Sequence, residues 1–94
     1  MSQAPLQAAY TSQFKKDWKR CQKAHQAMGA LRDVVEKLIK RVPLEPKHKD
    51  HQLGGNNKDF RECHVRPAWL LAYMIKNGEI TFTRTGSHAE LFGK

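Results

Sequence analysis

Long apolar runs, cysteines and acidic residues are all scarce in this 94-residue chain. The longest uncharged apolar stretch, Ala68–Ile75, is far shorter than the roughly 20 residues that cross a bilayer. Residues 2–9 are small and polar, so they lack the basic-then-apolar order of a signal peptide. We therefore expect a soluble, cytoplasmic protein that does not act at a membrane.

The two cysteines, Cys21 and Cys63, are too few and too far apart for a disulfide framework or a cysteine metal motif. His48 and His51 have a ligand-like spacing, but no cysteine pair accompanies them, and structural zinc normally takes four nitrogen or sulfur ligands. We therefore expect a reducing compartment, no metal and no cofactor. The length allows one domain, placed here over residues 1–94.

Because acidic residues are scarce, the chain has 17 Lys and Arg against 9 Asp and Glu, a formal charge of +8. Most of the excess lies in residues 1–49. This imbalance favours a polyanion partner, above all nucleic acid, although solubility alone is an alternative. Lys15, Lys16 and Lys19 lie opposite the apolar stripe of a predicted helix. They are candidates for contact with ribosomal RNA, or they form an ordinary solvated face.

Periodicity predicts an α+β fold in the order β-α-α-β-β-β. Residues 6–10 read as a short edge strand, and Thr11 or Ser12 can cap the helix that follows. Apolar residues at helical spacing then form two stripes, which Gly29 is expected to separate. The first stripe comprises Phe14, Trp18, Cys21, His25 and Met28. The second comprises Leu31, Val34, Val35, Leu38, Ile39 and Val42.

The sequence pattern of the second half of the chain predicts a loop followed by a three-stranded antiparallel meander. Residues 43–58 contain two prolines and paired glycines and asparagines, which indicate a loop. Strands are expected over 60–65, 68–75 and 80–85, with Asn77 and Gly78 in a hairpin turn. The predicted architecture is an antiparallel sheet with a two-helix hairpin on one face; if the first strand joins the same sheet through a crossover, that connection should be right-handed.

Four residues near predicted strand ends and loops suit metal-free RNA cleavage. In this reaction the 2′-hydroxyl attacks the neighbouring phosphate, and imidazole can remove its proton or protonate the leaving oxygen. A guanidinium can stabilise the charge that builds on the phosphoryl oxygens. His51, His64, His88 and Arg84 supply these groups. From spacing alone, this is one hypothesis among several.

Several ordered motifs make the chain similar to a known family. They are residues 10–17 (YTSQFKKD), 49–53 (KDHQL), 60–65 (FRECHV), 67–73 (PAWLLAY) and 84–92 (RTGSHAELF). Together they resemble the YafQ branch of the RelE/ParE toxin superfamily. The resemblance implies a RelE-like fold and a type II toxin that acts as a ribosome-dependent endoribonuclease on translated mRNA. It also implies a cognate antitoxin, which would link the toxin indirectly to operator DNA.

The resemblance assigns candidate roles to individual residues. His51, His64 and His88 match the family's active-site histidines, and Arg84 matches its arginine in the last strand. Phe92 and Trp69 also match the family, and Arg61 follows Phe60 in the matching strand; each of the three has an alternative role. Phe92 would stack on a nucleobase or anchor the tail; Trp69 would contact RNA or pack in the core; and Arg61 would contact phosphate or be a solvated strand charge.

One position departs from the family pattern. Where the pattern reads Pro-Asp-Trp, this chain has Ala68, which cannot exchange a proton or accept a side-chain hydrogen bond. The resemblance therefore implies the loss of a carboxylate that would orient or assist a histidine. Either the site functions with histidine and arginine, helped by Asp50 or Glu62, or its activity is impaired.

Two other functions share this fold. A non-catalytic relative would bind only RNA or its antitoxin; Ala68 favours this reading, while the retained histidines and arginine oppose it. A ParE-type toxin would inhibit gyrase, but the three histidines argue against that activity.

Overall fold

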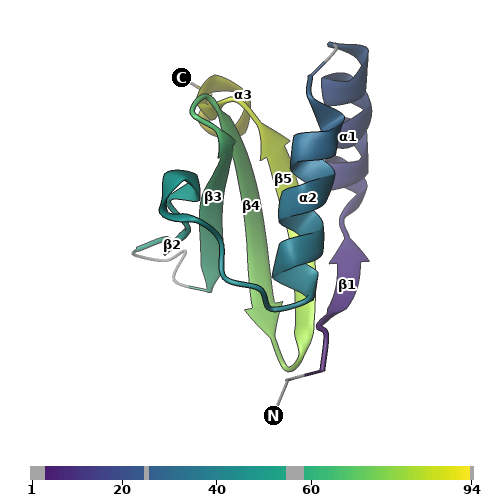
Figure 1. The fold of residues 1–94 in the computed structure, drawn as a ribbon. Helices are drawn as coiled ribbons and strands as arrows, with labels where there is room; N and C mark the ends of the chain where they lie inside the picture. The colour runs from purple at the N-terminus through teal and green to yellow at the C-terminus, as the bar shows by residue number, and fades with distance from the viewer. Residues whose placement is uncertain (1–3, 25, 55–58, 94) are drawn as a thin grey trace.

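The computed structural model describes residues 4–24, 26–54 and 59–93, and the backbone but not the side chain of Phe92. Within them, five strands form one sheet in the order β1-β5-β4-β3-β2, and α1 and α2 lie side by side over one face (Figure 1). The elements are β1 (Gln7–Tyr10), α1 (Ser12–Lys23), α2 (Met28–Ile39), the 3-10 turn η1 (Pro46–His48), β2 (His51–Gln52), β3 (Phe60–Arg66), β4 (Trp69–Lys76), β5 (Glu79–Gly86) and α3 (His88–Phe92).

The predicted α+β class and element order are confirmed, but the sheet is mixed. β2, β3, β4 and β5 pair antiparallel, whereas β1 pairs with β5 in parallel. The first strand thus joins the sheet, but at the edge formed by the last strand. The chain also forms elements that the sequence pattern did not predict: η1 and β2 within the expected loop, and α3 in the tail.

α1 begins where its cap residue predicts. The Thr11 hydroxyl accepts a hydrogen bond from the Phe14 backbone N–H at 2.9 Å, which satisfies one of the donors left open at a helix start. The same hydroxyl donates to the Thr83 carbonyl of β5 at 2.9 Å. The cap therefore fixes both the start of the helix and its position against the sheet.

The boundary between the two helices differs from the prediction. Gly29 lies inside α2 and does not separate the helices; α1 ends at Lys23 and α2 starts at Met28. α2 ends at Ile39, before the prolines, and Arg41 adopts a positive φ of 61° just beyond it. Val42, assigned to the apolar stripe, is consequently 45% exposed. His25, from the other stripe, lies outside the described residues.

The core lies between the helix pair and the sheet. Phe14 of α1 packs against Phe82 of β5, and Phe82 contacts Tyr73 of β4. β4 is buried at every position from Trp69 to Tyr73 and lies between β3 and β5 in the middle of the sheet. The hairpin after it has the predicted turn, with Asn77 at φ 52° and Gly78 at φ 78°. No helix within the described ranges is long and apolar enough to span a membrane.

Candidate active site

The sheet register brings most of the predicted catalytic residues onto one face. His51 pairs with Glu62, Glu62 with Ala72, and Ala72 with Arg84, which makes one row across four strands. His64 lies two residues after Glu62 in β3 and begins a second row, in which it pairs with Leu70 and Leu70 pairs with Gly86. Because paired residues share a face and side chains alternate along a strand, both rows project from the same side of the sheet. The Cα atoms of His51 and Arg84 are separated by three strand spacings, about 14 Å.

His64 has a defined tautomer. Its Nδ1 lies 3.1 Å from the Pro67 carbonyl oxygen, and since a carbonyl can only accept, Nδ1 carries the proton. Nε2 is then the nitrogen that can take or give a proton elsewhere. Burial of the flanking Cys63 and Val65 on the opposite face fixes the strand beneath it. The hydrogen bond to Pro67 therefore fixes the His64 ring and leaves Nε2 for proton transfer.

His51 is held in the same way and faces a carboxylate. Its Nδ1 donates to the Lys49 carbonyl at 2.7 Å, and its Nε2 lies 3.8 Å from Glu62 Oε1. The Glu62 side chain is only 9% exposed. Within the described part of the chain, Glu62 Oε2 is the one buried side-chain N or O atom that lacks a hydrogen-bond partner. A proton on His51 Nε2 would complete an ion pair with this carboxylate.

Arg84 is anchored by a buried acid on α1. Its Nε donates to Asp17 Oδ2 at 2.8 Å and its Nη2 lies 3.3 Å from Oδ1. The Asp17 side chain is fully buried, and it also accepts from the Thr85 backbone N–H at 3.1 Å. Burial raises the pKa of Asp17, but hydrogen bonds from Arg84, Arg20, Gln13 and Thr85 outweigh it and hold that pKa below its ordinary value. Asp17 is therefore a fixed anion that orients Arg84.

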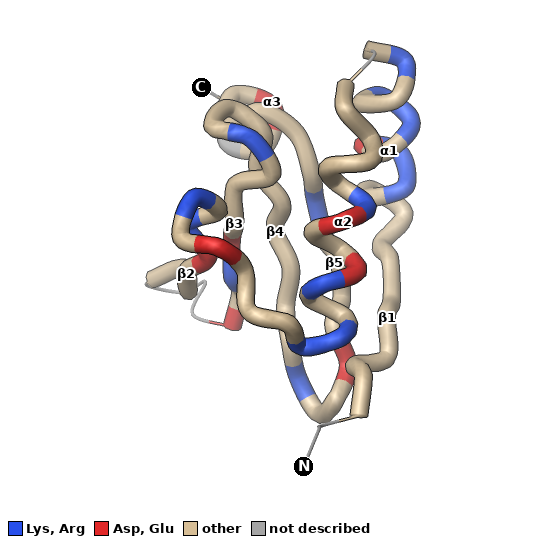
Figure 2. Tube along the Cα trace, in the orientation of Figure 1, with Lys and Arg blue, Asp and Glu red and all other residues tan. Residues whose placement is uncertain are grey.

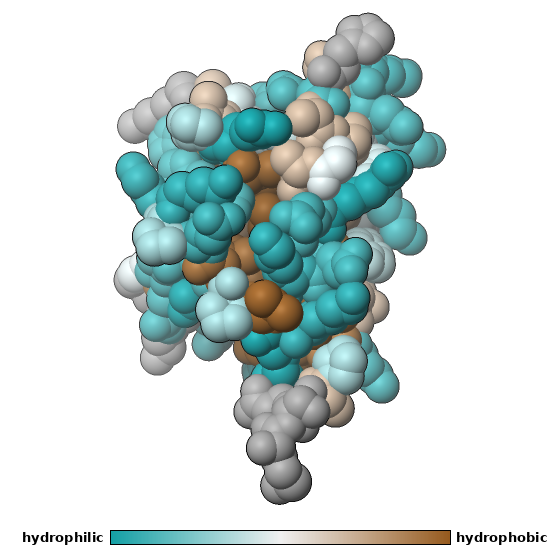
Figure 3. Space-filling view, viewed as in Figure 1, coloured by the Kyte–Doolittle hydropathy of each residue, from teal (hydrophilic) through white to brown (hydrophobic). Residues whose placement is uncertain are grey.

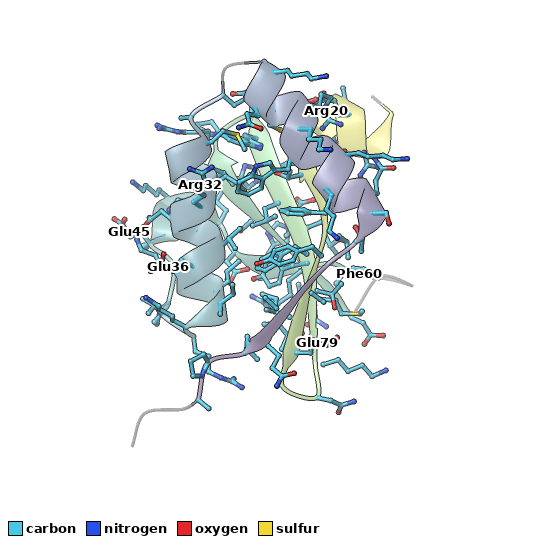
Figure 4. The ribbon with its side chains drawn as sticks, turned by 90° about the vertical axis from the view of Figure 1, so that its right-hand side faces the viewer. Arg20, Arg32, Glu36, Glu45, Phe60 and Glu79 are labelled. Atoms are coloured by element: carbon cyan, nitrogen blue, oxygen red, sulfur yellow. The ribbon has the colours of Figure 1, made fainter. Side chains whose placement is uncertain are left out.

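α3 places His88 next to this network. Ser87 and Glu90 form a reciprocal capping box at its start. Arg20 of α1, labelled beside α3 in Figure 4, lies 2.7 Å from Glu90 and donates to the Thr85 carbonyl at 2.8 Å. A side chain at Gly86, where φ is 152°, would bring its Cβ within 2.5 Å of Arg20 Nη2. His88 is exposed and lies in α3, two residues after Gly86, which ends the second row.

Ala68 occupies the turn between β3 and β4. It is exposed and directly follows Pro67, whose carbonyl accepts the hydrogen bond from His64. The position where the family pattern has aspartate thus adjoins the backbone group that holds a predicted catalytic histidine. Of the two carboxylates considered as substitutes, Glu62 faces His51, whereas Asp50 is bonded to Tyr73 and Arg61.

The other predicted RNA-contact residues lie in different surroundings. Trp69 is 4% exposed and donates through Nε1 to the Thr85 hydroxyl at 2.9 Å. It therefore packs in the core, which was one of its two predicted roles. Arg61 is half-buried and bonded to Tyr73 and Asp50. It is therefore neither a solvated charge nor part of the histidine face. The Phe92 side chain lies outside what the structure describes.

The three predicted lysines lie on α1, away from both rows. Lys15, Lys16 and Lys19 are exposed, and Figure 2 shows basic residues along the outer side of that helix. Lys15 and Lys19 flank an apolar groove of about 700 Å³ between α1 and α2, lined by Phe14, Trp18 and Val35 among others. This groove is therefore on the helix side and not at the histidines.

The sequence pattern gave no signal for Asp17, which supports this site. It reads as one charge in a basic helix, and two of its partners, Arg84 and Thr85, are more than 60 residues away along the chain. Glu62, named from the sequence as a possible substitute carboxylate, lies two residues before His64 in β3 and hence on the same face.

Known proteins similar to this chain include members of one family of toxins. A family model described as the YafQ bacterial toxin of type II toxin–antitoxin systems matches residues 6–93. The mRNA interferase toxin YafQ of Escherichia coli K12 is 42% identical over 85 residues, covering 89% of this chain and 92% of that protein. The toxin in the E. coli DinJ–YafQ complex superposes with a TM-score of 0.89 at 40% identity, covering 95% of this chain and 99% of that one.

A metal-bound toxin from Helicobacter pylori is also similar, with a TM-score of 0.86 and 44% identity over 93% of this chain and 99% of that one. Among the residues described here, however, no group of three or more His, Cys, Asp or Glu side chains is arranged to hold a metal ion.

The family model spans nearly the whole chain, and the relatives match it over most of their own length. The chain therefore belongs to the YafQ family of bacterial toxins of type II toxin–antitoxin systems.

Proposed function

We propose that this toxin is a ribosome-dependent endoribonuclease that cleaves translated mRNA. The observation that carries the proposal is the register row from His51 through Glu62 and Ala72 to Arg84, with His64 in the row beside it. His88 begins α3, two residues after Gly86 at the end of that second row. Imidazoles and a guanidinium are the groups that RNA cleavage at neutral pH requires. The E. coli relative named as an mRNA interferase supports the same activity.

In the proposed reaction the 2′-oxygen attacks the adjacent phosphorus and the bond to the 5′-oxygen breaks. The histidines share the two proton transfers: one removes the 2′-hydroxyl proton and another protonates the leaving 5′-oxygen. The products are a 2′,3′-cyclic phosphate and a 5′-hydroxyl. The Nε2 atoms of His64 and His51 suit these roles, because in both rings Nδ1 is already committed to a backbone carbonyl.

Arg84 and Glu62 complete the mechanism. Asp17 occupies Nε and Nη2 along one edge of the Arg84 guanidinium, so the edge with Nη1 is available to a phosphoryl oxygen. The Arg84 side chain is one-third exposed and can be reached from solvent. Glu62 orients the His51 ring and stabilises its protonated form, the role that a carboxylate plays beside a catalytic histidine.

The test of this function is primer extension on an mRNA in a translating extract. Addition of the protein should produce new 5′ ends within the translated region, and an inhibitor that keeps ribosomes off the mRNA should abolish them. A protein that binds ribosomes or RNA without generating new ends would instead be the non-catalytic relative that Ala68 favours.

Restoring the carboxylate at position 68 is expected to speed cleavage. Ala68 is exposed in a turn, so Ala68→Asp should fold normally and place an anion beside the residue that holds His64. We expect a gain of about tenfold or more, because an orienting carboxylate improves acid–base catalysis. Ala68→Asn, with the same shape and no charge, is the control. Equal rates for all three proteins would mean that a carboxylate at this position has no role.

The partner that fits this toxin is a protein antitoxin. Antitoxin complexes of the E. coli relative support such a partner, and a net charge of +8 favours an acidic segment that covers the basic and catalytic surfaces. Through the antitoxin the toxin would also reach operator DNA. Because the proposed substrate is mRNA on ribosomes, we place the activity in the cytoplasm.

The exposed lysines of α1 are expected to contact ribosomal RNA. Replacing Lys15, Lys16 and Lys19 with glutamine should weaken ribosome binding and flatten its salt dependence by about 0.7–0.9 log units per log salt for each lost phosphate contact. Lys40→Gln with Lys76→Gln is the control, because both residues are exposed outside α1. Ribosome pelleting across a salt series measures the slope. An unchanged slope in the α1 variant would show that this face is only solvated.

A further inference from the structure

The short segment that carries His51 is attached to the sheet by few contacts. β2 has only two residues, and its neighbour Leu53 adds one backbone bond to Phe60 at 2.9 Å. On the N-terminal side, the His48 ring donates to the His64 carbonyl at 2.7 Å. A two-residue strand orders its side chains weakly by itself. Contacts that hold Asp50, the residue directly before His51, therefore help to set the direction of the His51 imidazole.

Asp50, directly before His51, is held by two side chains from neighbouring strands. The Tyr73 hydroxyl of β4 donates to Asp50 Oδ1. Arg61 of β3 donates through Nε to the Tyr73 oxygen at 3.3 Å, and its Nη2 lies 3.4 Å from Asp50 Oδ2. The three side chains close a ring of interactions, and together with Leu44 and Val42 they line a hollow of about 250 Å³. Figure 3 shows hydrophobic residues between α2 and the segment that carries η1.

Tyr73 is the rigid member of this ring. It is 1% exposed, packs against Phe82 and is fixed in the middle of the central strand. Burial raises the pKa of Tyr73, and its hydrogen bond to Asp50 raises it further. The hydroxyl therefore keeps its proton and remains a donor to the carboxylate.

The interactions of Asp50, Tyr73 and Arg61 lie on one face of the sheet, and the histidines lie on the other. Arg61 pairs with Tyr73 on the side covered by the helices, whereas the neighbouring pair, Glu62 and Ala72, projects from the other side. Successive residues of a strand point in opposite directions. Holding Asp50 on the covered side therefore turns His51 to the open side, where its Nε2 faces Glu62.

We propose that Tyr73 is a positioning residue that acts through Asp50 to set the orientation of the His51 imidazole. The inference rests on the proposed nuclease function for its effect on rate, but the orientation itself can be measured without catalysis. No atom of Tyr73 needs to touch RNA in this role.

The test is Tyr73→Phe, which removes one oxygen and keeps the buried ring. We expect kcat for ribosome-dependent cleavage to fall about 10- to 100-fold with KM changed less than about twofold, because misplacement of a catalytic group by about 1 Å can cost that much. Tyr10→Phe removes the same atom from a tyrosine that is 43% exposed on β1 and should leave kcat unchanged.

A second readout does not depend on activity. In nitrogen-15 NMR spectra, Tyr73→Phe should shift and broaden the ring signals of His51 while those of His88 stay in place. Asp50→Asn, which keeps an acceptor for the Tyr73 hydroxyl, should preserve the His51 signals better than Asp50→Ala. Unshifted His51 signals in Tyr73→Phe would overturn the inference. If the unmodified protein cleaves nothing, the proposed function fails, and the NMR comparison still decides the positioning role.

Discussion

The His88→Ala variant is expected to cleave ribosome-bound mRNA about 10²–10⁴-fold more slowly than the unmodified chain, the usual contribution of a general acid or base. His88 lies at the exposed start of α3. Single-turnover cleavage on stalled ribosomes measures the rate, and thermal unfolding checks the fold.

Glu79→Ala is a suitable control for this variant. Glu79 is exposed at the opposite end of β5 and lies in neither row of the site. Its loss should leave the cleavage rate within about twofold. If His88→Ala retained full activity, His88 would have no part in proton transfer, and His51 with His64 would have to supply both the base and the acid.

Asp17→Asn is expected to destabilise the fold strongly. Asp17 is fully buried and accepts hydrogen bonds from Arg84, Arg20 and the Thr85 backbone. Asparagine has nearly the same shape, but its NH₂ group would face donors and leave the guanidinium groups without their anion. We expect a loss of about 3 kcal/mol, lowering Tm by more than about 10 °C. Cleavage should also fall, since Arg84 loses its support.

The matched control is Asp33→Asn, the same chemical change at an exposed ion pair. The Asp33 side chain is 61% exposed and lies 3.2 Å from Lys37, one turn along α2. Exposed pairs of this kind contribute about 0.5 kcal/mol or less. Equal destabilisation by the two substitutions would contradict the anchoring role of Asp17.

The stability difference between the unmodified chain and Asp17→Asn should depend on pH. The pKa of Asp17 is lowered in the folded state, so its contribution is fully present above its unfolded pKa of about 3.9. That contribution is lost as the pH falls through the folded value. Urea midpoints of the two proteins should therefore differ most above about pH 5 and converge in stronger acid. A constant difference would mean that the ionised carboxylate is not what stabilises the fold.

Local sequence signals predicted the parts of the fold that local physics determines. Thr11 caps α1, Asn77 and Gly78 form the hairpin turn, and alternation marks β5. The direction of β1 was not predictable in this way, because parallel pairing with β5 depends on contacts about 70 residues apart. α3 was missed because five residues are too few to show a helical period, although Ser87 and Glu90 have the spacing of a capping box.

Some residues of the candidate site could be predicted from the sequence, and others could not. Resemblance to a family pointed to the histidines and Arg84, and the register explains how distant residues reach one sheet face. The supporting groups were not predictable, because Asp17 and Tyr73 act through partners that only the tertiary structure brings near. Trp69 shows the converse, since an aromatic residue within a matching motif can belong to the core.

The most direct test of the account is end-group analysis of mRNA fragments made by this protein on translating ribosomes. Catalysis by histidines and Arg84, with attack by the 2′-hydroxyl, predicts a 2′,3′-cyclic phosphate on one fragment and a 5′-hydroxyl on the other. It also predicts no cleavage when the nucleotide before the scissile bond is 2′-deoxy. Fragments with a 5′-phosphate, or equal cleavage at the 2′-deoxy position, would contradict the mechanism that the two rows of the sheet support.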